Sequence, residues 1–118
     1  MMSFLYIVDK YQLIKDEIYE LYKFVLIVTD AYRKEGLPVP VAAKYGYNAR
    51  AEQINRHIDE FNDDIHNKSR LYVGAQLSGN ARNERENYIH WLDTTYDRSP
   101  LERIPDRFEA ANAHVINR

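Results

Sequence analysis

The chain has 118 residues, of which 45% are hydrophobic and 29% charged, and its formal net charge is −2. These values are typical of one globular domain, exclude a largely disordered chain, and give no compositional support to nonspecific nucleic-acid binding. The absence of cysteine excludes disulfides, thiolate metal sites and a cysteine nucleophile. We expect a cytoplasmic protein, because the N-terminus lacks a signal-peptide pattern and no apolar run approaches the roughly 20 residues that span a bilayer.

Residues 1–35 are predicted to form one long helix. Apolar or aromatic residues recur at alternating spacings of three and four, which is the heptad pattern of a helix with one buried face. The residues of this seam are Phe4, Ile7, Tyr11, Ile14, Ile18, Leu21, Val25, Val28 and Tyr32. Ser3 is a favourable N-cap and Gly36 ends the helix. The second half has apolar residues on further faces, such as Tyr19 and Leu26, and we expect it to be buried within the domain.

The length of this helix predicts self-association. A helix of about 33 residues measures about 50 Å, whereas a compact domain of this size has a radius of gyration of about 13–14 Å. We therefore expect the first half to meet a second copy of the chain in a homodimer, through the residues Phe4, Ile7, Tyr11, Ile14 and Ile18. A parallel two-stranded coil is disfavoured, because it would bring Lys10 close to Lys15 of the other chain, and antiparallel or bundle pairing avoids that clash. Residues 4–8 and 24–28 also suit β-strands, which is the local alternative.

A second helix is predicted over residues 48–77, after a proline- and glycine-containing linker over residues 36–47. Its apolar seam is narrow and the remaining positions are almost wholly polar, which indicates a surface helix. The seam residues are Ala51, Ile54, Ile58, Phe61, Ile65 and Tyr72. Lys68 falls in the same register and interrupts the seam.

A third helix is predicted over residues 80–97, with an aromatic face that includes Tyr88 and Tyr96. Trp91 and Leu92 are neighbours on this helix and cannot both point in one direction. We expect one of them to face away from the core.

Short helices are predicted over the C-terminal residues 99–118. Two capping-box patterns begin at Ser99 and Asp106, and proline follows Ser99 directly. The sequence thus predicts an all-α protein, in which a single helical domain of all 118 residues forms an antiparallel bundle with short links.

Acidic pairs on two predicted helices suggest metal-dependent chemistry as one alternative. Glu17 and Glu20 lie three residues apart, as do Glu60 and Asp63, and this arrangement resembles the acidic pairs of the all-α pyrophosphohydrolase family. The resemblance implies a magnesium-dependent nucleotide hydrolase with these carboxylates as metal ligands. Glu60 and Asp63 lie away from the apolar seam, however, and a solvated helix face accounts for them better. We therefore assign no catalytic residue, metal ligand or cofactor.

Residues 41–48 resemble the first helix and turn of a helix-turn-helix DNA-binding unit. In that interpretation Ala42 packs inside, Gly46 makes the turn and Asn48 opens a recognition helix. The side chains that would face DNA are Arg50, Gln53 and Arg56. Two prolines shorten the first helix and the net charge is negative, so this is the second choice.

Aromatic and arginine residues, the types enriched at interface hot spots, are abundant in the chain. The candidate partner-binding residues are Tyr45, Tyr47, Arg50, Arg56, Arg82, Arg85, Trp91, Tyr96 and Arg98. We therefore expect a small non-enzymatic interaction module that binds a larger macromolecular partner as a regulator or inhibitor, such as an accessory protein of a phage or mobile element.

Overall fold

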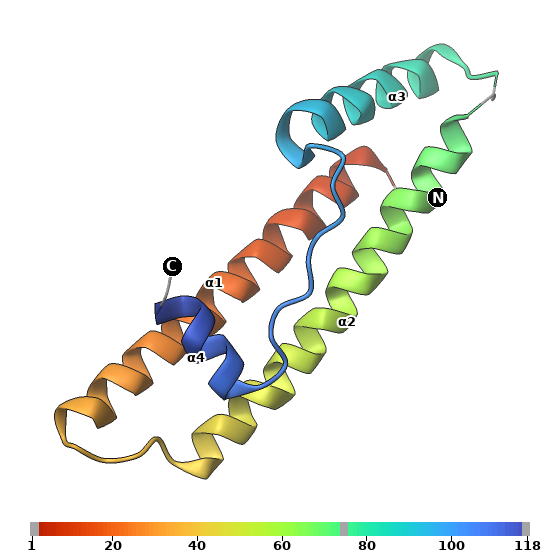
Figure 1. The fold of residues 1–118 in the computed structure, drawn as a ribbon. Helices are drawn as coiled ribbons and strands as arrows, with labels where there is room; N and C mark the ends of the chain where they lie inside the picture. The colour runs from red at the N-terminus through yellow and green to blue at the C-terminus, as the bar shows by residue number, and fades with distance from the viewer. Residues whose placement is uncertain (1–2, 74–75, 117–118) are drawn as a thin grey trace.

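Two long antiparallel helices form the body of the protein, as the computed structural model shows (Figure 1). Helix α1 spans Phe4–Lys34 and α2 spans Val41–Tyr72. Helix α3 spans Gly79–Trp91, the π-helical turn η1 spans Leu92–Tyr96, and the short helix α4 spans Phe108–Ile116. The structure describes residues 3–73 and 76–116, and within these ranges it contains no β-strand. The all-α prediction is confirmed, and the β-strand alternative for residues 4–8 and 24–28 is wrong.

The ends of α1 follow the signals in the sequence. The Ser3 hydroxyl accepts a hydrogen bond from the N–H of Tyr6 at 3.2 Å and caps the first turn. At the other end Gly36 has a φ of 68°, and the N–H of Leu37 donates to the carbonyl of Tyr32 at 2.9 Å. This is a Schellman arrangement, for which glycine is favoured because it has no Cβ to clash.

The heptad seams of α1 and α2 face each other inside one chain. Ile7, Ile14, Leu21 and Val25 of α1 are buried in one cluster with the α2 seam, in which Ile54, Ile58 and Phe61 have no exposed area. Helix α2 is as long as α1 and lies alongside it, and the buried residues of α1 run from Ile7 to Val25. The molecule is correspondingly elongated, with extents of 63 × 22 × 17 Å and a radius of gyration of 18.5 Å. Within one chain, α2 matches the length of α1 and covers its buried seam.

Helix α2 begins seven residues earlier than expected. The predicted linker over 36–47 is confined to residues 35–40, because the chain turns helical at Val41 directly after Pro40. Gly46 lies inside this helix, where glycine costs about 0.5–1 kcal/mol relative to alanine. Burial of the neighbouring Tyr47, whose ring packs edge-on against Phe108 at 6.0 Å, offsets that cost. At its other end α2 stops at Tyr72, and residues 74–75 of the predicted helix 48–77 lie outside the described residues.

The third predicted helix, over 80–97, divides into α3 and η1. Ser78 caps α3 by accepting a hydrogen bond from the N–H of Ala81. At the junction both Trp91 and Leu92 are buried, so the prediction that one of them faces away from the core is wrong. The wider π-helical turn begins at this point and changes the direction in which the following side chains project.

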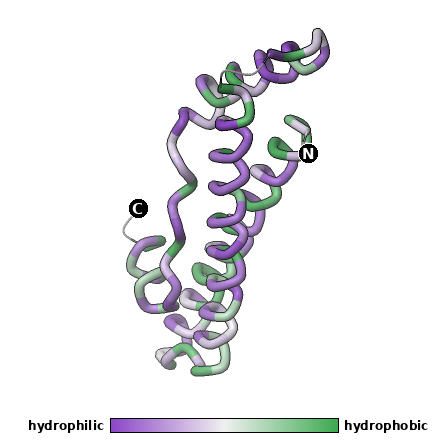
Figure 2. Tube along the Cα trace, turned by 90° about the vertical axis from the view of Figure 1, so that its right-hand side faces the viewer, coloured by the Kyte–Doolittle hydropathy of each residue, from purple (hydrophilic) through white to green (hydrophobic). Residues whose placement is uncertain are grey.

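The segment 97–107, which we call the arm, is extended where the sequence predicted a helical start at Ser99. It leaves η1 through two residues in the left-handed region, Asp97 and Arg98, and runs back along the helical hairpin to α4 (Figure 1). Hydrophilic and hydrophobic residues alternate along the hairpin that it follows (Figure 2). The predicted short C-terminal helix is confirmed as α4, with Phe108 and Ala111 buried.

Three asparagines of α2 hold the arm in place. Asn62 exchanges two hydrogen bonds of 3.0 Å with the backbone of Leu101, and Asn55 does the same with Ile104 at 3.0 and 2.8 Å. Asn48 accepts from the N–H of Phe108 at 2.9 Å and thereby caps α4. Each asparagine follows a buried seam residue, and the three are spaced by seven along α2. The asparagine side chains thus supply hydrogen-bond partners to backbone N–H and C=O groups of the arm, which has no regular secondary structure to pair them.

Within residues 3–73 and 76–116, no helix has a stretch that is both long and apolar enough to cross a lipid bilayer.

Candidate functional site

The residues predicted for self-association lie mostly inside the subunit. Ile7 and Ile14 are each only 1% exposed, packed between α1 and α2. Phe4, Tyr11 and Ile18 are half-buried against the same core. This corrects the expectation that the first half of α1 offers its seam to a second copy, because the seam is already covered by α2 and, near its start, by α3.

The predicted partner-binding residues do not form one surface. Tyr47, Trp91 and Tyr96 belong to the core, which corrects their assignment to an interface. Tyr47 donates a hydrogen bond from its hydroxyl to the carbonyl of Pro105 at 2.6 Å, and burial raises the pKa of its phenol above the ordinary value. Trp91 stacks on Tyr96 with ring centroids 5.3 Å apart.

The remaining candidates, Tyr45 of α2 and the arginines, are exposed but scattered. Arg50 and Arg56 lie on α2, where Arg50 pairs with Glu17 at 3.1 Å and Arg56 with Glu52 at 3.7 Å. Arg82 and Arg85 are on the exposed face of α3, and Arg98 pairs with Asp93 after η1. Ion pairs within the subunit therefore account for three of these five arginines.

One residue of each acidic pair that suggested a metal site contacts cations of the protein itself, whereas the other residues, Glu20 and Asp63, are exposed. The Glu17 carboxylate is mostly buried and lies 3.1 Å from Arg50 Nη2 and 3.3 Å from His57 Nδ1. Glu60 lies 3.8 Å from Lys10, on the solvent side of α2. Among the described residues no three histidine or acidic side chains converge in a way that could hold a metal ion. Glu17 and Glu60 supply ion pairs between α1 and α2.

The helix-turn-helix interpretation required a turn at Gly46, and the structure contradicts it. Helix α2 is continuous from Val41 to Tyr72, so Ala42 and Asn48 belong to the same helix. Ala42 is exposed, and Asn48 caps α4. Gln53 is exposed on the same long helix, and no second helix begins near it to act as a recognition helix.

Lys68, which interrupts the α2 seam, joins three helices. Its ammonium lies 2.8 Å from Glu84 of α3 and 4.9 Å from the centre of the Tyr72 ring. The same Glu84 oxygen accepts a hydrogen bond from the N–H of Phe4 at the start of α1. The hydrogen bond from Lys68 lowers the pKa of Glu84, and although burial opposes the charge on Lys68, its bonds to Glu84 and Tyr72 leave the pKa of Lys68 raised.

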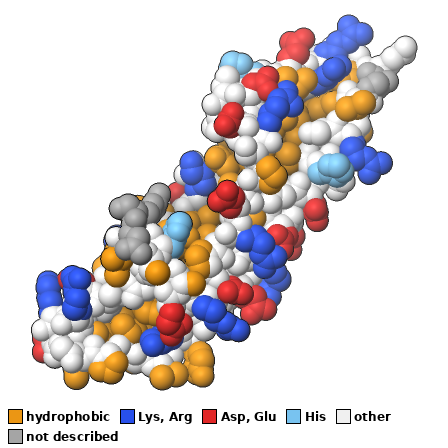
Figure 3. Space-filling model, in the orientation of Figure 1, with side chains coloured by type: hydrophobic (Ala, Val, Ile, Leu, Met, Phe, Trp, Pro, Cys, Tyr) orange, Lys and Arg blue, Asp and Glu red, His pale blue; other side chains and the backbone are white. Residues whose placement is uncertain are grey.

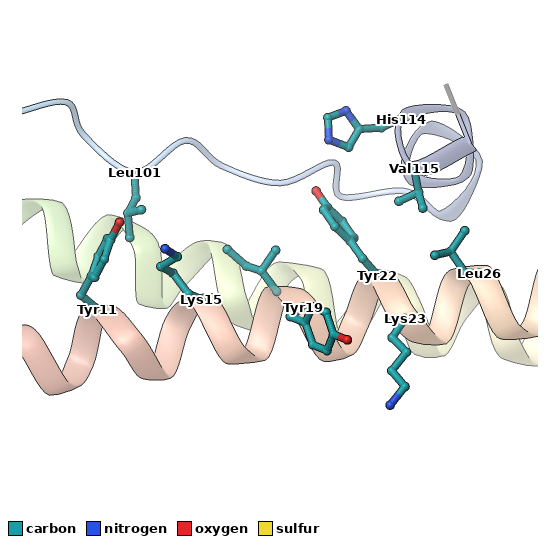
Figure 4. A pocket seen from close by; sticks show the side chains of 10 residues that line it. Tyr11, Lys15, Tyr19, Tyr22, Lys23, Leu26, Leu101, His114 and Val115 are labelled. Atoms are coloured by element: carbon teal, nitrogen blue, oxygen red, sulfur yellow. The ribbon is translucent and has the colours of Figure 1, made fainter. Parts of the chain in front are cut away.

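An apolar groove lies along one face of α1. It has a volume of about 530 Å³ and lies between α1, the arm and α4 (Figure 4). Its lining residues are Tyr11, Lys15, Ile18, Tyr19, Tyr22, Lys23, Leu26, Leu101, His114 and Val115. Hydrophobic side chains gather along this face of the molecule, with both basic and acidic side chains beside them (Figure 3).

The groove is open because α4 is short. Tyr19 is 65% and Leu26 48% exposed, which corrects the expectation that the second half of α1 is buried within the domain. The apolar pattern on extra faces of α1 was the sequence signal for this surface. This pattern predicted burial within the domain, but the short α4 covers only part of that surface.

Two lysines lie at the edge of the groove. Lys15 is placed over the Tyr11 ring, with its ammonium 5.1 Å from the ring centre, and Figure 4 shows it directed toward the arm. Lys23 is on the outer side of α1 beside Tyr19 (Figure 4). Neither lysine forms an ion pair with any other described residue. The groove thus combines an apolar floor with unneutralised positive charge.

Comparison of the chain with protein-family models, with curated proteins and with solved structures gave no match.

Proposed function

We propose that this protein is a small non-enzymatic interaction module that binds a larger macromolecule through the α1 groove and acts as a regulator or inhibitor. The observation that supports this role is the exposure of Tyr19 and Leu26 beside a groove of about 530 Å³. Exposed apolar surface next to a concavity is typical of binding sites, and tyrosine is a frequent anchor residue. An accessory protein of a phage or mobile element would be one setting for such a module.

The construction of the groove favours binding with little rearrangement. Its floor is α1, whose seam of Ile7, Ile14, Leu21 and Val25 is buried against α2. One wall is the arm, which the hydrogen bonds of Asn55 and Asn62 hold against α2. A site carried by fixed elements loses less conformational entropy on binding than a mobile loop does.

Self-association and a cytoplasmic location remain part of this proposal, but different residues support the dimer. The flank of α1 opposite the groove exposes Tyr6 and Leu13, which line a smaller recess of about 340 Å³ beside α2. A second copy of the chain would cover this flank and leave the groove free.

The test is capture of the partner by the full chain and by two matched variants. Tyr19 and Leu13 are both exposed on α1, at 65% and 59%, but lie on opposite flanks of the helix. We expect Tyr19→Ser to remove a protein or nucleic-acid partner that the unmodified chain retains from its host lysate, and Leu13→Ser to retain it. Equal retention by both variants would contradict a binding role for the groove.

A further inference from the structure

We infer that the α1 groove binds an amphipathic helix that carries acidic residues beside its apolar face. This inference rests on the proposed function and names the class of its partner. Three observations support it: the ridge pattern of the exposed α1 surface, the shortage of groups that could satisfy an extended backbone, and the two lysines without ion pairs.

The exposed side chains of α1 form ridges and grooves of the kind that pack against a second helix. Ile18, Tyr22 and Leu26 are spaced by four and form one ridge on the groove side of the helix. Tyr11, Lys15, Tyr19 and Lys23 are spaced by four as well and form the neighbouring ridge. The depression between two such ridges accepts a row of side chains from a second helix. The segment from Tyr11 to Leu26 is about 22 Å long at 1.5 Å per residue, which matches about four turns of a partner helix.

An extended peptide fits this groove poorly, as the protein's own arm demonstrates. The arm lies extended on α2 because Asn48, Asn55 and Asn62 satisfy its backbone. The groove lining offers tyrosine hydroxyls, lysine ammonium groups and one imidazole, but no amide side chain that could pair with the N–H and C=O of one residue together, as Asn55 does for the arm. A helix satisfies its own backbone internally and needs no such groups.

The charge at the groove selects acidic partners. Lys15 and Lys23 lie two turns apart on α1, on either side of Tyr19, and have no counter-ion among the described residues. The Lys15 ammonium is directed toward the arm and Lys23 lies on the outer side of α1 (Figure 4), so carboxylates on both edges of the apolar face of a bound helix would be needed to meet the two ammonium groups. His114 also faces the groove, with its ring 5.7 Å from that of Tyr22, and adds no negative charge. The formal net charge of the whole chain is −2, so a preference for acidic ligands would be a local property of this site.

Two designed peptides test the inference. Both are helices of about 18 residues with leucines at positions i, i+4, i+7 and i+11. One carries glutamates beside the leucine stripe, and the other carries lysines at the same positions. We expect fluorescence anisotropy at low salt to show that the acidic peptide binds the full chain about tenfold more tightly than the basic one, a difference of about 1.4 kcal/mol.

Substitutions in the protein distinguish the groove from the rest of the surface. The double variant Lys15→Glu/Lys23→Glu should reverse the preference, and Lys15→Arg/Lys23→Arg should keep it. Tyr19→Ser should weaken binding of the acidic peptide, whereas Leu13→Ser should not. All variants change exposed side chains, and circular dichroism with urea unfolding confirms that each is folded before binding is compared.

Several results would overturn the inference. The inference fails if the basic peptide binds more tightly than the acidic one. It also fails if the Lys15→Glu/Lys23→Glu change has no effect on this preference, or if an acidic peptide interrupted by proline binds equally well. Self-association that Tyr19→Ser abolishes would mean that a second copy fills the groove. If Tyr19→Ser removes a partner from lysate but the acidic peptide shows no preference, the proposed function stands and this inference fails. If Tyr19→Ser changes neither the capture of a partner from lysate nor the binding of the acidic peptide, the proposed function and this inference both fail.

Discussion

Asn55 of α2 holds both backbone groups of Ile104 in the arm. Its Nδ2 donates to the Ile104 carbonyl at 3.0 Å, and its Oδ1 accepts from the Ile104 N–H at 2.8 Å. Both residues are buried, so water cannot replace these bonds. One side chain thereby fixes the position of the arm that forms a wall of the groove.

Replacement of Asn55 should therefore destabilise the fold substantially. Asn55→Ala leaves a buried N–H and a buried C=O of Ile104 without partners, at a cost of about 1–3 kcal/mol each. We expect the free energy of unfolding to fall by about 2–4 kcal/mol in urea titration. Asn67→Ala, at an exposed position of the same helix, is the control and should change stability by less than about 0.5 kcal/mol. A similar small effect of Asn55→Ala would mean that the arm is not held by this contact.

Glycine substitutions test the continuity of α2. Gly46 is inside the helix without a positive φ, and a Cβ placed there meets no atom within 4 Å. Gly46→Ala should therefore stabilise the protein by about 0.4–1 kcal/mol and raise its Tm by a few degrees.

Gly36→Ala is the matched comparison for Gly46→Ala. Gly36 has a φ of 68°, in the region that side-chain-bearing residues avoid. We expect this change to destabilise the protein by about 1 kcal/mol in the same thermal scans. A destabilising Gly46→Ala would instead indicate a turn at that position.

The Lys68–Glu84 pair predicts a loss of stability in acid. The pKa of Glu84 is lowered in the folded state, chiefly by the hydrogen bond from Lys68. A group with a depressed folded pKa stabilises the fold fully above its unfolded value, about 4.3 for glutamate, and loses this contribution as the pH falls through the folded value. Urea midpoints between pH 7 and pH 3 should therefore fall less for Glu84→Gln than for the unmodified chain. Glu86→Gln, an exposed neighbour on α3, should follow the unmodified chain.

Light scattering tests self-association directly. At tens of micromolar we expect about twice the chain mass of 14.0 kDa. Leu13→Asp should reduce the mass to that of one chain, because it replaces an exposed leucine of the flank opposite the groove by a carboxylate, and Tyr19→Asp should leave the dimer intact. If the unmodified chain has the mass of a monomer, the proposed self-association is wrong.

Several local features of the fold could be predicted from neighbouring residues alone. The spacing of Ile7, Ile14 and Leu21 identified the buried face of α1, because a helix brings residues of that period to one side. Ser3 and Gly36 marked its ends for equally local reasons. The repeated asparagines after Tyr47, Ile54 and Phe61 were a further regular signal, but their partners lie 39 to 60 residues away in sequence.

The surfaces that cover each helix face are set by contacts between distant parts of the chain. The sequence by itself determined that α1 is a helix with an apolar seam, since that follows from backbone geometry and side-chain spacing. Only the tertiary structure decided that α2 covers the seam, that Trp91 and Leu92 are both buried, that Lys68 meets Glu84, and that α4 leaves Tyr19 exposed. The physical reason is that apolar periodicity shows which side of a helix avoids water but does not identify the surface that will cover it.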